Sequence, residues 1–188
     1  MLSLFPELSS GPPGFVYIPN FISVEEENAL LTFVRDMELH PLLFQGFEAK
    51  RKVVSFGYDY NFDTRKILKG QPIPDAFHPL VDKVAETLSI QANEIAEVLV
   101  TEYPPGAVIN WHRDAPPFKV IAGISLLEPS VFKFRPHDKA KQDRKSIISI
   151  PVDRRSFYSI ADEARSEWQH SISPVKSLRY SITLRTLQ

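Results

Sequence analysis

The chain has 188 residues, of which 43% are hydrophobic and 24% charged, and its formal net charge is −1. This size and composition are typical of one soluble domain, and the near-zero charge gives no overall attraction to nucleic acid. The absence of cysteine excludes disulfides, thiolate metal sites and a cysteine nucleophile, so a metal would need histidine and carboxylate ligands. The opening stretch MLSLFPELSSGPPGF is too short and interrupted for a signal peptide, and no apolar run approaches membrane-spanning length. We therefore expect a cytoplasmic protein without membrane contact.

Two helices are predicted in the first half of the chain. In residues 23–39, Ser23 and Glu26 have capping-box spacing, and an apolar stripe follows with helical periodicity. A second helix is predicted over residues 75–88, directly after Pro74. A short strand is expected before the first helix, and aromatic and β-branched residues predict strands on either side of Gly57.

The second half of the chain contains mainly strand patterns. Strands are predicted over 95–103, 107–114, 120–127, 130–135, 146–152, 155–161 and 179–187. Two helices followed by many short strands, without βα alternation, favour an antiparallel β-sandwich with the helices packed on one sheet. No repeat or linker marks a boundary, so we predict a single domain over residues 1–188.

The segment NWHRDAPPF places His112 and Asp114 two positions apart. On a strand, such residues point to the same face, so the pair could supply two ligands to one metal ion. His170, in SEWQHSI, can supply a third ligand from a later strand. Two histidines and one carboxylate form the facial triad of non-haem Fe(II) oxygenases. Taken alone, a His-x-Asp pair is more often an ordinary hydrogen-bonded pair at a strand end.

The C-terminal segment LRYSITLR contains a second pattern. Arg179 and Arg185 are separated by an even number of residues and therefore share one strand face with Ser181 and Thr183. Two inward-facing arginines are costly to bury unless they meet an anion, and a guanidinium grips a carboxylate with two parallel hydrogen bonds. The alternative is the exposed polar side of an edge strand. Together with the triad, the arginines favour an iron centre with a 2-oxo dicarboxylate beside it.

With these residues in place, the chain resembles the AlkB-type Fe(II)/2-oxoglutarate dioxygenases, which remove alkyl groups from nucleic-acid bases. The resemblance lies in an ordered set: a tyrosine before Pro-Gly, His-x-Asp, a later histidine, and Arg-Tyr-x-Ile-Thr-x-Arg. It covers most of the chain and is strongest from TEYPPGAVINWHRD to the final strand. It implies a mainly β (α+β) double-stranded β-helix, or jelly roll, with the N-terminal helices packed on one sheet.

The resemblance also implies roles for individual residues. His112, Asp114 and His170 would bind Fe(II), and Arg179 would hold the distal carboxylate of 2-oxoglutarate with a hydrogen bond from Tyr103. Arg185 would lie near the metal, where it can meet both cofactor and substrate and take part in catalysis. Two further cofactor positions depart from the family pattern, since Thr101 and Ser181 stand where relatives often have asparagine.

The implied reaction is oxidative dealkylation of N-alkylated bases in DNA repair, which consumes O₂ and releases an aldehyde, succinate and CO₂. Residues 46–65 align with the substrate-covering lid of the family, and Arg51, Tyr58 and Tyr60 are the substrate-binding candidates. The expected partner is alkylated DNA or RNA, bound by a monomer. The segment 115–118 lacks the acidic residues with which some relatives recognise the base, so base preference stays open.

Two alternatives remain at this point. The iron site could act on a transfer RNA or a protein side chain, or the chain could be a non-catalytic jelly-roll module that binds nucleic acid or a small anion. The intact triad and both arginines disfavour the module. A second basic segment, residues 132–145, holds six Lys/Arg against two Asp. It is interpreted as a solvated hairpin tip, with contact to a nucleic-acid backbone as the alternative.

Overall fold

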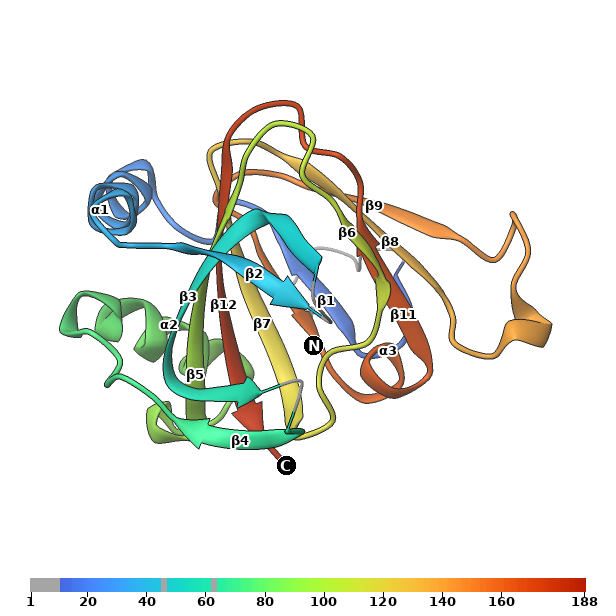
Figure 1. Cartoon of the computed structure of the whole chain (residues 1–188), viewed down its shortest axis with the longest axis horizontal. Helices are drawn as coiled ribbons and strands as arrows, with labels where there is room; N and C mark the ends of the chain where they lie inside the picture. Colours follow the sequence, from blue (N-terminus) through green and yellow to red (C-terminus); the bar gives the residue numbers. More distant parts are fainter. Residues whose placement is uncertain (1–10, 45–46, 62–63) are drawn as a thin grey trace, which may run out of the picture.

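The computed structural model describes residues 11–44, 47–61 and 64–188, and in this part of the chain two antiparallel sheets face each other (Figure 1). The major sheet has the strand order β1-β10-β7-β12-β5-β3-β2, with β4 paired to β3, and the minor sheet has the order β6-β11-β8-β9. The major-sheet strands are β1 (Phe15–Ile18), β2 (His40–Phe44), β3 (Phe47–Asn61), β4 (Lys66–Lys69), β5 (Ile95–Tyr103), β7 (Phe118–Leu126), β10 (Phe157–Ile160) and β12 (Arg179–Leu187). The minor-sheet strands are β6 (Ile109–His112), β8 (Ser130–Pro136), β9 (Ile148–Val152) and β11 (Trp168–Ile172).

The helices α1 (Val24–Arg35) and α2 (His78–Leu88) cover the face of the major sheet that points away from the minor sheet (Figure 1). The predicted capping box is present, because the Ser23 hydroxyl accepts the Glu26 N–H and the Glu26 carboxylate accepts the Ser23 N–H. Short helical segments complete the described elements: η1 (Asp75–Phe77), η2 (Ala92–Glu94), η3 (Lys139–Lys141) and α3 (Asp162–Ser166). None of the described helices has the length and apolar character that crossing a bilayer requires.

Two hydrophobic cores lie on opposite sides of the major sheet. One joins α1 and α2 to the sheet and includes Tyr180, Ile182 and Leu184 of β12. The other fills the space between the two sheets. The alternation predicted for the last strand is therefore correct, because its apolar residues face the helices while Arg179 and its even-spaced neighbours face the minor sheet. Since β12 lies between β5 and β7, these polar residues occupy the centre of the major sheet.

Strand β3 changes its partner at Gly57. Up to this residue β3 pairs with β5, and from Tyr58 onward it pairs with β4. Gly57 has a φ of +84°, and a Cβ atom there would collide with the carbonyl oxygen of Ala96. The Gly57 N–H donates to the Gln71 carbonyl at 2.6 Å, which fixes the crossing. A regular alternation along β3 would put Phe56 and Tyr60 on one face, but Phe56 packs in the helix-side core, whereas Tyr60 packs against the core between the sheets.

Candidate metal centre

His112, Asp114 and His170 offer ligand atoms that all lie within 4.8 Å of one another. The two histidines are opposite each other across β6 and β11, with ring centroids 4.3 Å apart. The sequence had predicted a strand that includes Asp114, but β6 ends at His112. Asp114 therefore lies in the segment that follows β6. The three side chains thus come from the paired strands β6 and β11 of the minor sheet and from the segment that follows β6. They face the major sheet.

The His112 ring is held in one orientation by its own strand. Its Nδ1 atom lies 2.8 Å from the Asn110 carbonyl oxygen, an acceptor, so Nδ1 carries the proton. The Nε2 atom then keeps its lone pair for a metal. A backbone carbonyl that fixes the tautomer in this way is a common support for a metal-binding histidine.

Asp114 and His170 form a buried pair whose geometry suits a cation. Asp114 Oδ2 lies 3.3 Å from His170 Nε2, and this oxygen has no hydrogen-bond partner among the described residues. Burial, with repulsion from His112, lowers the pKa of His170 to about 3, so its ring is neutral at neutral pH. Burial opposes ionisation of Asp114, but the nearby His170 and Arg185 outweigh it and hold its pKa below the usual range. A neutral imidazole, an ionised carboxylate and an oxygen without a partner fit a divalent metal ion.

Arg179 is the largest fully buried side chain in the described part of the chain, and it has the features of an anion-binding group. Its Nη2 donates to Ser125 Oγ at 3.2 Å, while Nε and Nη1 have no partner among the described residues. Its guanidinium carbon lies 4.8 Å from the centre of the Tyr103 ring. A buried guanidinium with two unpaired donors is costly unless an anion accepts them, and a carboxylate has the matching geometry.

The other predicted cofactor residues surround Arg179. Tyr103 is opposite Arg179 in the β5–β12 pairing, and Thr101 is opposite Ser181. The Ser181 hydroxyl donates to the Tyr103 hydroxyl at 3.4 Å, and all of these side chains are buried. The structure therefore gathers Tyr103, Thr101 and Ser181 around one guanidinium, as expected for a dicarboxylate site.

Arg185 lies near the three residues His112, Asp114 and His170, as predicted, but most of its hydrogen-bond donors bind protein carboxylates. Its Nη2 donates to Asp114 Oδ1 at 3.1 Å and its Nη1 donates to Glu97 Oε2 at 2.5 Å. Only its buried Nε has no partner among the described residues. The guanidinium can therefore support the aspartate ligand, but in this arrangement it does not present a free two-pronged face to the cofactor.

A cavity of about 1210 Å³ opens beside the candidate metal ligands. Its lining includes two of the three predicted substrate residues, Arg51 and Tyr60, together with His112 and Asp114. Five of the described lining residues are Lys or Arg and two are Asp or Glu, so the cavity is basic although the whole chain is close to neutral. The basic lining residues are Lys50, Arg51, Arg65, Arg113 and Arg165.

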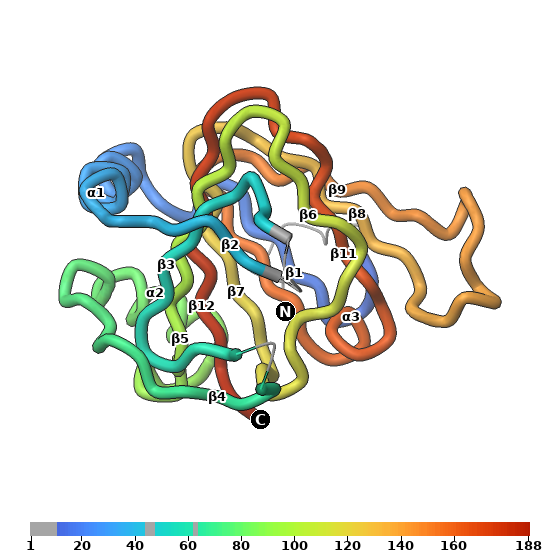
Figure 2. Tube along the Cα trace, in the orientation of Figure 1, coloured from blue at the N-terminus to red at the C-terminus, as the bar shows by residue number. Residues whose placement is uncertain are grey.

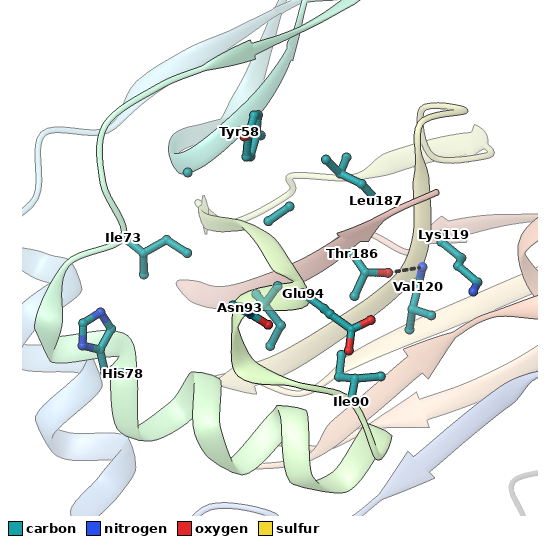
Figure 3. Close-up of a pocket in the computed structure, with 13 residues that line it drawn as sticks. Tyr58, Ile73, His78, Ile90, Asn93, Glu94, Lys119, Val120, Thr186 and Leu187 are labelled. Atoms are coloured by element: carbon teal, nitrogen blue, oxygen red, sulfur yellow. Dashed lines mark hydrogen bonds between the residues drawn. The ribbon is translucent and has the colours of Figure 1, made fainter.

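Tyr58, the third substrate candidate, does not line this cavity. It is 37% exposed and borders a separate cavity of about 670 Å³, together with His78, Glu94 and Thr186 (Figure 3). The partner change at Gly57 separates Tyr58 from the part of β3 that pairs with β5 and carries Arg51, but Tyr58 and Tyr60 both follow Gly57 and both pair with β4. In the second cavity, the Glu94 carboxylate accepts the Gln91 N–H and the Thr186 hydroxyl accepts the Val120 N–H, so both groups have structural roles.

Several residues at the site were missed from the sequence. Ser125 contacts Arg179, and Glu97 contacts Arg185. Arg165 of α3 donates to the carbonyls of Ala115 and Phe118, which holds the segment that follows Asp114. The available signal for Glu97 was its even spacing to Thr101 and Tyr103, which puts it on the strand face of the predicted cofactor residues. Ser125 and Arg165 depend on strand pairing and on a five-residue helix that the pattern did not indicate.

The fold and the site define a class of protein, namely metal-dependent oxygenases with two histidines and one carboxylate on a β-sandwich. Residues 14–185 match the family model described as the 2OG-Fe(II) oxygenase superfamily. The solved structure of OsALKBH1 is 13% identical with a TM-score of 0.72, and covers 95% of this chain and 100% of its own. A Pseudomonas putida prolyl-4-hydroxylase is 16% identical with a TM-score of 0.64, and the match covers 93% of this chain and 92% of that one. The double-stranded β-helix prediction is confirmed.

The relatives that are similar in sequence to this chain include several proteins with ALKBH names. The mouse "tRNA (carboxymethyluridine(34)-5-O)-methyltransferase ALKBH8" is 27% identical over 175 residues, which are 90% of this chain and 26% of that protein. The Arabidopsis thaliana "Alkylated DNA repair protein ALKBH8 homolog" is 29% identical over 94% of this chain and 59% of its own length. The Danio rerio "Probable RNA/DNA demethylase ALKBH6" is 26% identical over 89% of this chain and 73% of its own. This chain thus spans about a quarter of the mouse protein and over half of the Arabidopsis protein.

The chain belongs to the 2OG-Fe(II) oxygenase superfamily and is an AlkB-type dioxygenase, an enzyme that uses Fe(II), 2-oxoglutarate and O₂. The predicted family, enzyme class and cofactors are confirmed.

Proposed function

We propose that the protein oxidatively dealkylates N-alkylated nucleic-acid bases, as in the repair of alkylated DNA. The observation that carries the proposal is the basic, partly aromatic cavity into which His112 and Asp114 open. Lys and Arg side chains attract phosphates, while a tyrosine provides a surface for a base. The names of the Arabidopsis and zebrafish relatives, which refer to alkylated DNA repair and RNA/DNA demethylation, support the same substrate class.

The iron and 2-oxoglutarate, when bound, use O₂ to hydroxylate the N-alkyl carbon with release of succinate and CO₂, and the hydroxyalkyl base then loses an aldehyde. Within this scheme His112, Asp114 and His170 are the proposed iron ligands. Arg179, supported by Tyr103 and by the hydroxyls of Thr101 and Ser181, holds the distal carboxylate of 2-oxoglutarate.

The substrate base must leave its helix or come from a single strand, because an iron between two sheets cannot reach a base inside a duplex. Arg51 and Tyr60 of β3 line the cavity, and Lys50 and Arg65 extend the basic edge around it. We propose that residues 46–65, whose described part is mainly β3, cover the base once it has entered. Tyr60 provides the aromatic face, and Arg51 a positive charge for a flanking phosphate.

Outside the cavity, the minor sheet offers a path for the rest of the strand. The Arg135 guanidinium carbon lies 4.5 Å from the centre of the Trp111 ring, and Arg135 Nε donates to Gln169 at 2.7 Å. Trp111, Gln169 and His137 also line the cavity, so this cation–π pair lies at its margin. Beyond it, the connection between β8 and β9 projects from the body of the molecule (Figure 2) and carries Lys139, Lys141, Arg144 and Lys145, all exposed. These cations suit contacts with phosphates that flank the target base.

The test is aldehyde and succinate release from methylated oligonucleotides in the presence of Fe(II), 2-oxoglutarate and O₂. We expect both products in equal amounts, with loss of one methylene mass from the oligonucleotide. Single- and double-stranded DNA and RNA carrying the same lesion would define the preferred strand. Succinate formation that no methylated oligonucleotide stimulates would contradict the proposal.

A second candidate is hydroxylation or demethylation of a base in transfer RNA. The printed names of the mouse relative and of a Xenopus tropicalis relative refer to transfer RNA and favour this substrate. The methyl transfer in those names is not carried over, because this chain covers only 26% of each protein. A mass gain of one oxygen on transfer RNA, without aldehyde, would identify hydroxylation. A protein substrate has only the prolyl-4-hydroxylase likeness behind it, which concerns the fold alone. Cytoplasmic location and a monomeric state stay predictions.

A further inference from the structure

Glu97 is a buried carboxylate that the mechanism above does not use. It lies on β5, is 2% exposed, and is directly opposite Arg185 in the β5–β12 pairing. Its Oε2 accepts from Arg185 Nη1 at 2.5 Å, and its Oε1 accepts from the Ser55 hydroxyl at 2.9 Å. Burial of an ionised carboxylate costs several kcal/mol unless charge and hydrogen bonds compensate it, and here both oxygens are engaged.

The Arg185 guanidinium connects the Glu97 carboxylate to Asp114, one of the three proposed metal ligands. Its second terminal nitrogen donates to Asp114 Oδ1, while Asp114 Oδ2 points to His170. These contacts form a continuous chain of side chains in the order Ser55, Glu97, Arg185, Asp114 and His170. Four strands and the segment that follows β6 contribute to it. One cation lies between two carboxylates, and the side chains of all three are at most 14% exposed.

We propose that Glu97 is a positioning residue for the iron site: it fixes the Arg185 guanidinium and balances its charge, and thereby keeps the second oxygen of Asp114 oriented toward the metal. Without Glu97, Arg185 is free to turn both terminal nitrogens to Asp114. The aspartate would then be a weaker donor beside an unbalanced positive charge. A divalent cation would bind less tightly for both reasons.

The proposal does not depend on the substrate, but it rests on the proposed ligands His112, Asp114 and His170. His170→Ala tests these separately, since it should abolish tight metal binding. The probe for Glu97 is Co(II), whose visible absorption reports both its affinity and its ligand geometry in the folded protein. Metal binding is thus measured without turnover.

We expect Glu97→Gln to weaken Co(II) binding roughly 10- to 100-fold, the effect typical of lost outer contacts at metal sites. Its Co(II) spectrum should also change, because Asp114 is held differently. Glu97→Asp keeps the charge and should lose less. The matched control is Glu102→Gln, which removes a carboxylate from the same strand; Glu102 contacts Tyr180 and Lys52, away from the cluster. This control should bind Co(II) as the wild type does.

Glu97→Gln leaves a buried guanidinium short of a partner and can prevent folding, so Ser55→Ala provides a gentler test. It removes one hydrogen bond to Glu97 and no charge, and we expect a smaller loss of Co(II) affinity in the same direction. If Ser55→Ala and Glu97→Asp both bind Co(II) within twofold of wild type with unchanged spectra, Glu97 has only a structural role and the proposal is overturned.

Discussion

Asp114 Oδ2 and His170 Nε2 lie 3.3 Å apart between the two sheets, and the side chains of these residues are 8% and 9% exposed. The imidazole is neutral at neutral pH because burial lowers its pKa to about 3, whereas the carboxylate stays ionised. A buried negative oxygen beside a lone-pair-bearing nitrogen is stabilised when a cation lies between them. This relationship, rather than the His-x-Asp motif alone, is the structural argument for a metal at this point.

Replacement of either histidine should abolish turnover while the fold remains. In His112→Ala and His170→Ala the ion would keep only two protein ligands, so we expect succinate formation to fall to background. Circular dichroism should show an intact fold, because the apolar residues of both cores remain and, among the described ring contacts of these cores, only those of His170 with Phe132 and Phe134 are lost. His40→Ala is the control, since this histidine is exposed on β2 and far from the triad in the chain. Undiminished activity in either triad variant would remove that residue from the proposed iron site.

Arg179→Met should separate binding from stability. Loss of a charge-assisted pair of hydrogen bonds should raise the KM for 2-oxoglutarate roughly 10- to 100-fold. The cofactor-free protein should be as stable as the wild type or more so, because the variant removes a buried guanidinium with two unpaired donors. Thermal unfolding without and with 2-oxoglutarate measures both effects.

The matched control for Arg179→Met is Arg154→Met. Arg154 Nη2 donates to the fully buried Glu27 of α1 at 2.7 Å, and α1 covers the face of the major sheet opposite to the proposed cofactor site. We expect this control to lose about 1–3 kcal/mol of stability with an unchanged KM for 2-oxoglutarate. If Arg179→Met destabilised the cofactor-free protein to a similar extent, its guanidinium would have partners other than the cofactor.

Patterns confined to one strand or helix were predictable from the sequence. The even spacing of Arg179 and Arg185 correctly indicated a polar inner face on β12, and the Ser23–Glu26 spacing correctly indicated a helix start. The three proposed metal ligands were identified because each has a residue type that such chemistry requires. The patterns in β12 and at Ser23 needed only local geometry, namely the periods of strand and helix. His170 was joined to His112 and Asp114 by its residue type and by the family resemblance.

Features that depend on pairing between distant strands were not predictable. The contact between Glu97 and Arg185 follows from the register of β5 against β12, which no local pattern encodes. Tyr58 was expected beside Arg51 and Tyr60, but β3 leaves β5 for β4 at Gly57 and Tyr58 borders the other cavity. A glycine inside a strand pattern can signal that the strand changes its partner, but which strand becomes the new partner depends on the rest of the fold.

Tyr180 should give the protein a measurable alkaline sensitivity. Its hydroxyl donates to Glu102 at 2.6 Å, and burial together with this carboxylate raises its pKa to about 12. Because the folded-state pKa is above the unfolded value near 10, the phenol stabilises the fold fully below pH 10 and loses this effect as the pH rises toward 12. Tyr180→Phe should cost about 1–3 kcal/mol at pH 8. Its deficit in unfolding free energy should shrink above pH 10; a deficit that stays constant to pH 12 would contradict the shift.

Charge reversal in the β8–β9 connection tests whether flanking phosphates are bound there. Lys139→Glu/Lys141→Glu should raise the KM for a methylated oligonucleotide of about 20 nucleotides and flatten its salt dependence, since each lost phosphate contact lowers the log–log slope by about 0.7 on a single strand. For a trinucleotide the KM should not change, because so short a strand does not extend beyond the cavity. Lys119→Glu/Lys176→Glu is the control, with an equal change in net charge on exposed residues outside this connection. Equal KM values and salt slopes in the two double variants would instead assign the basic connection to solvent.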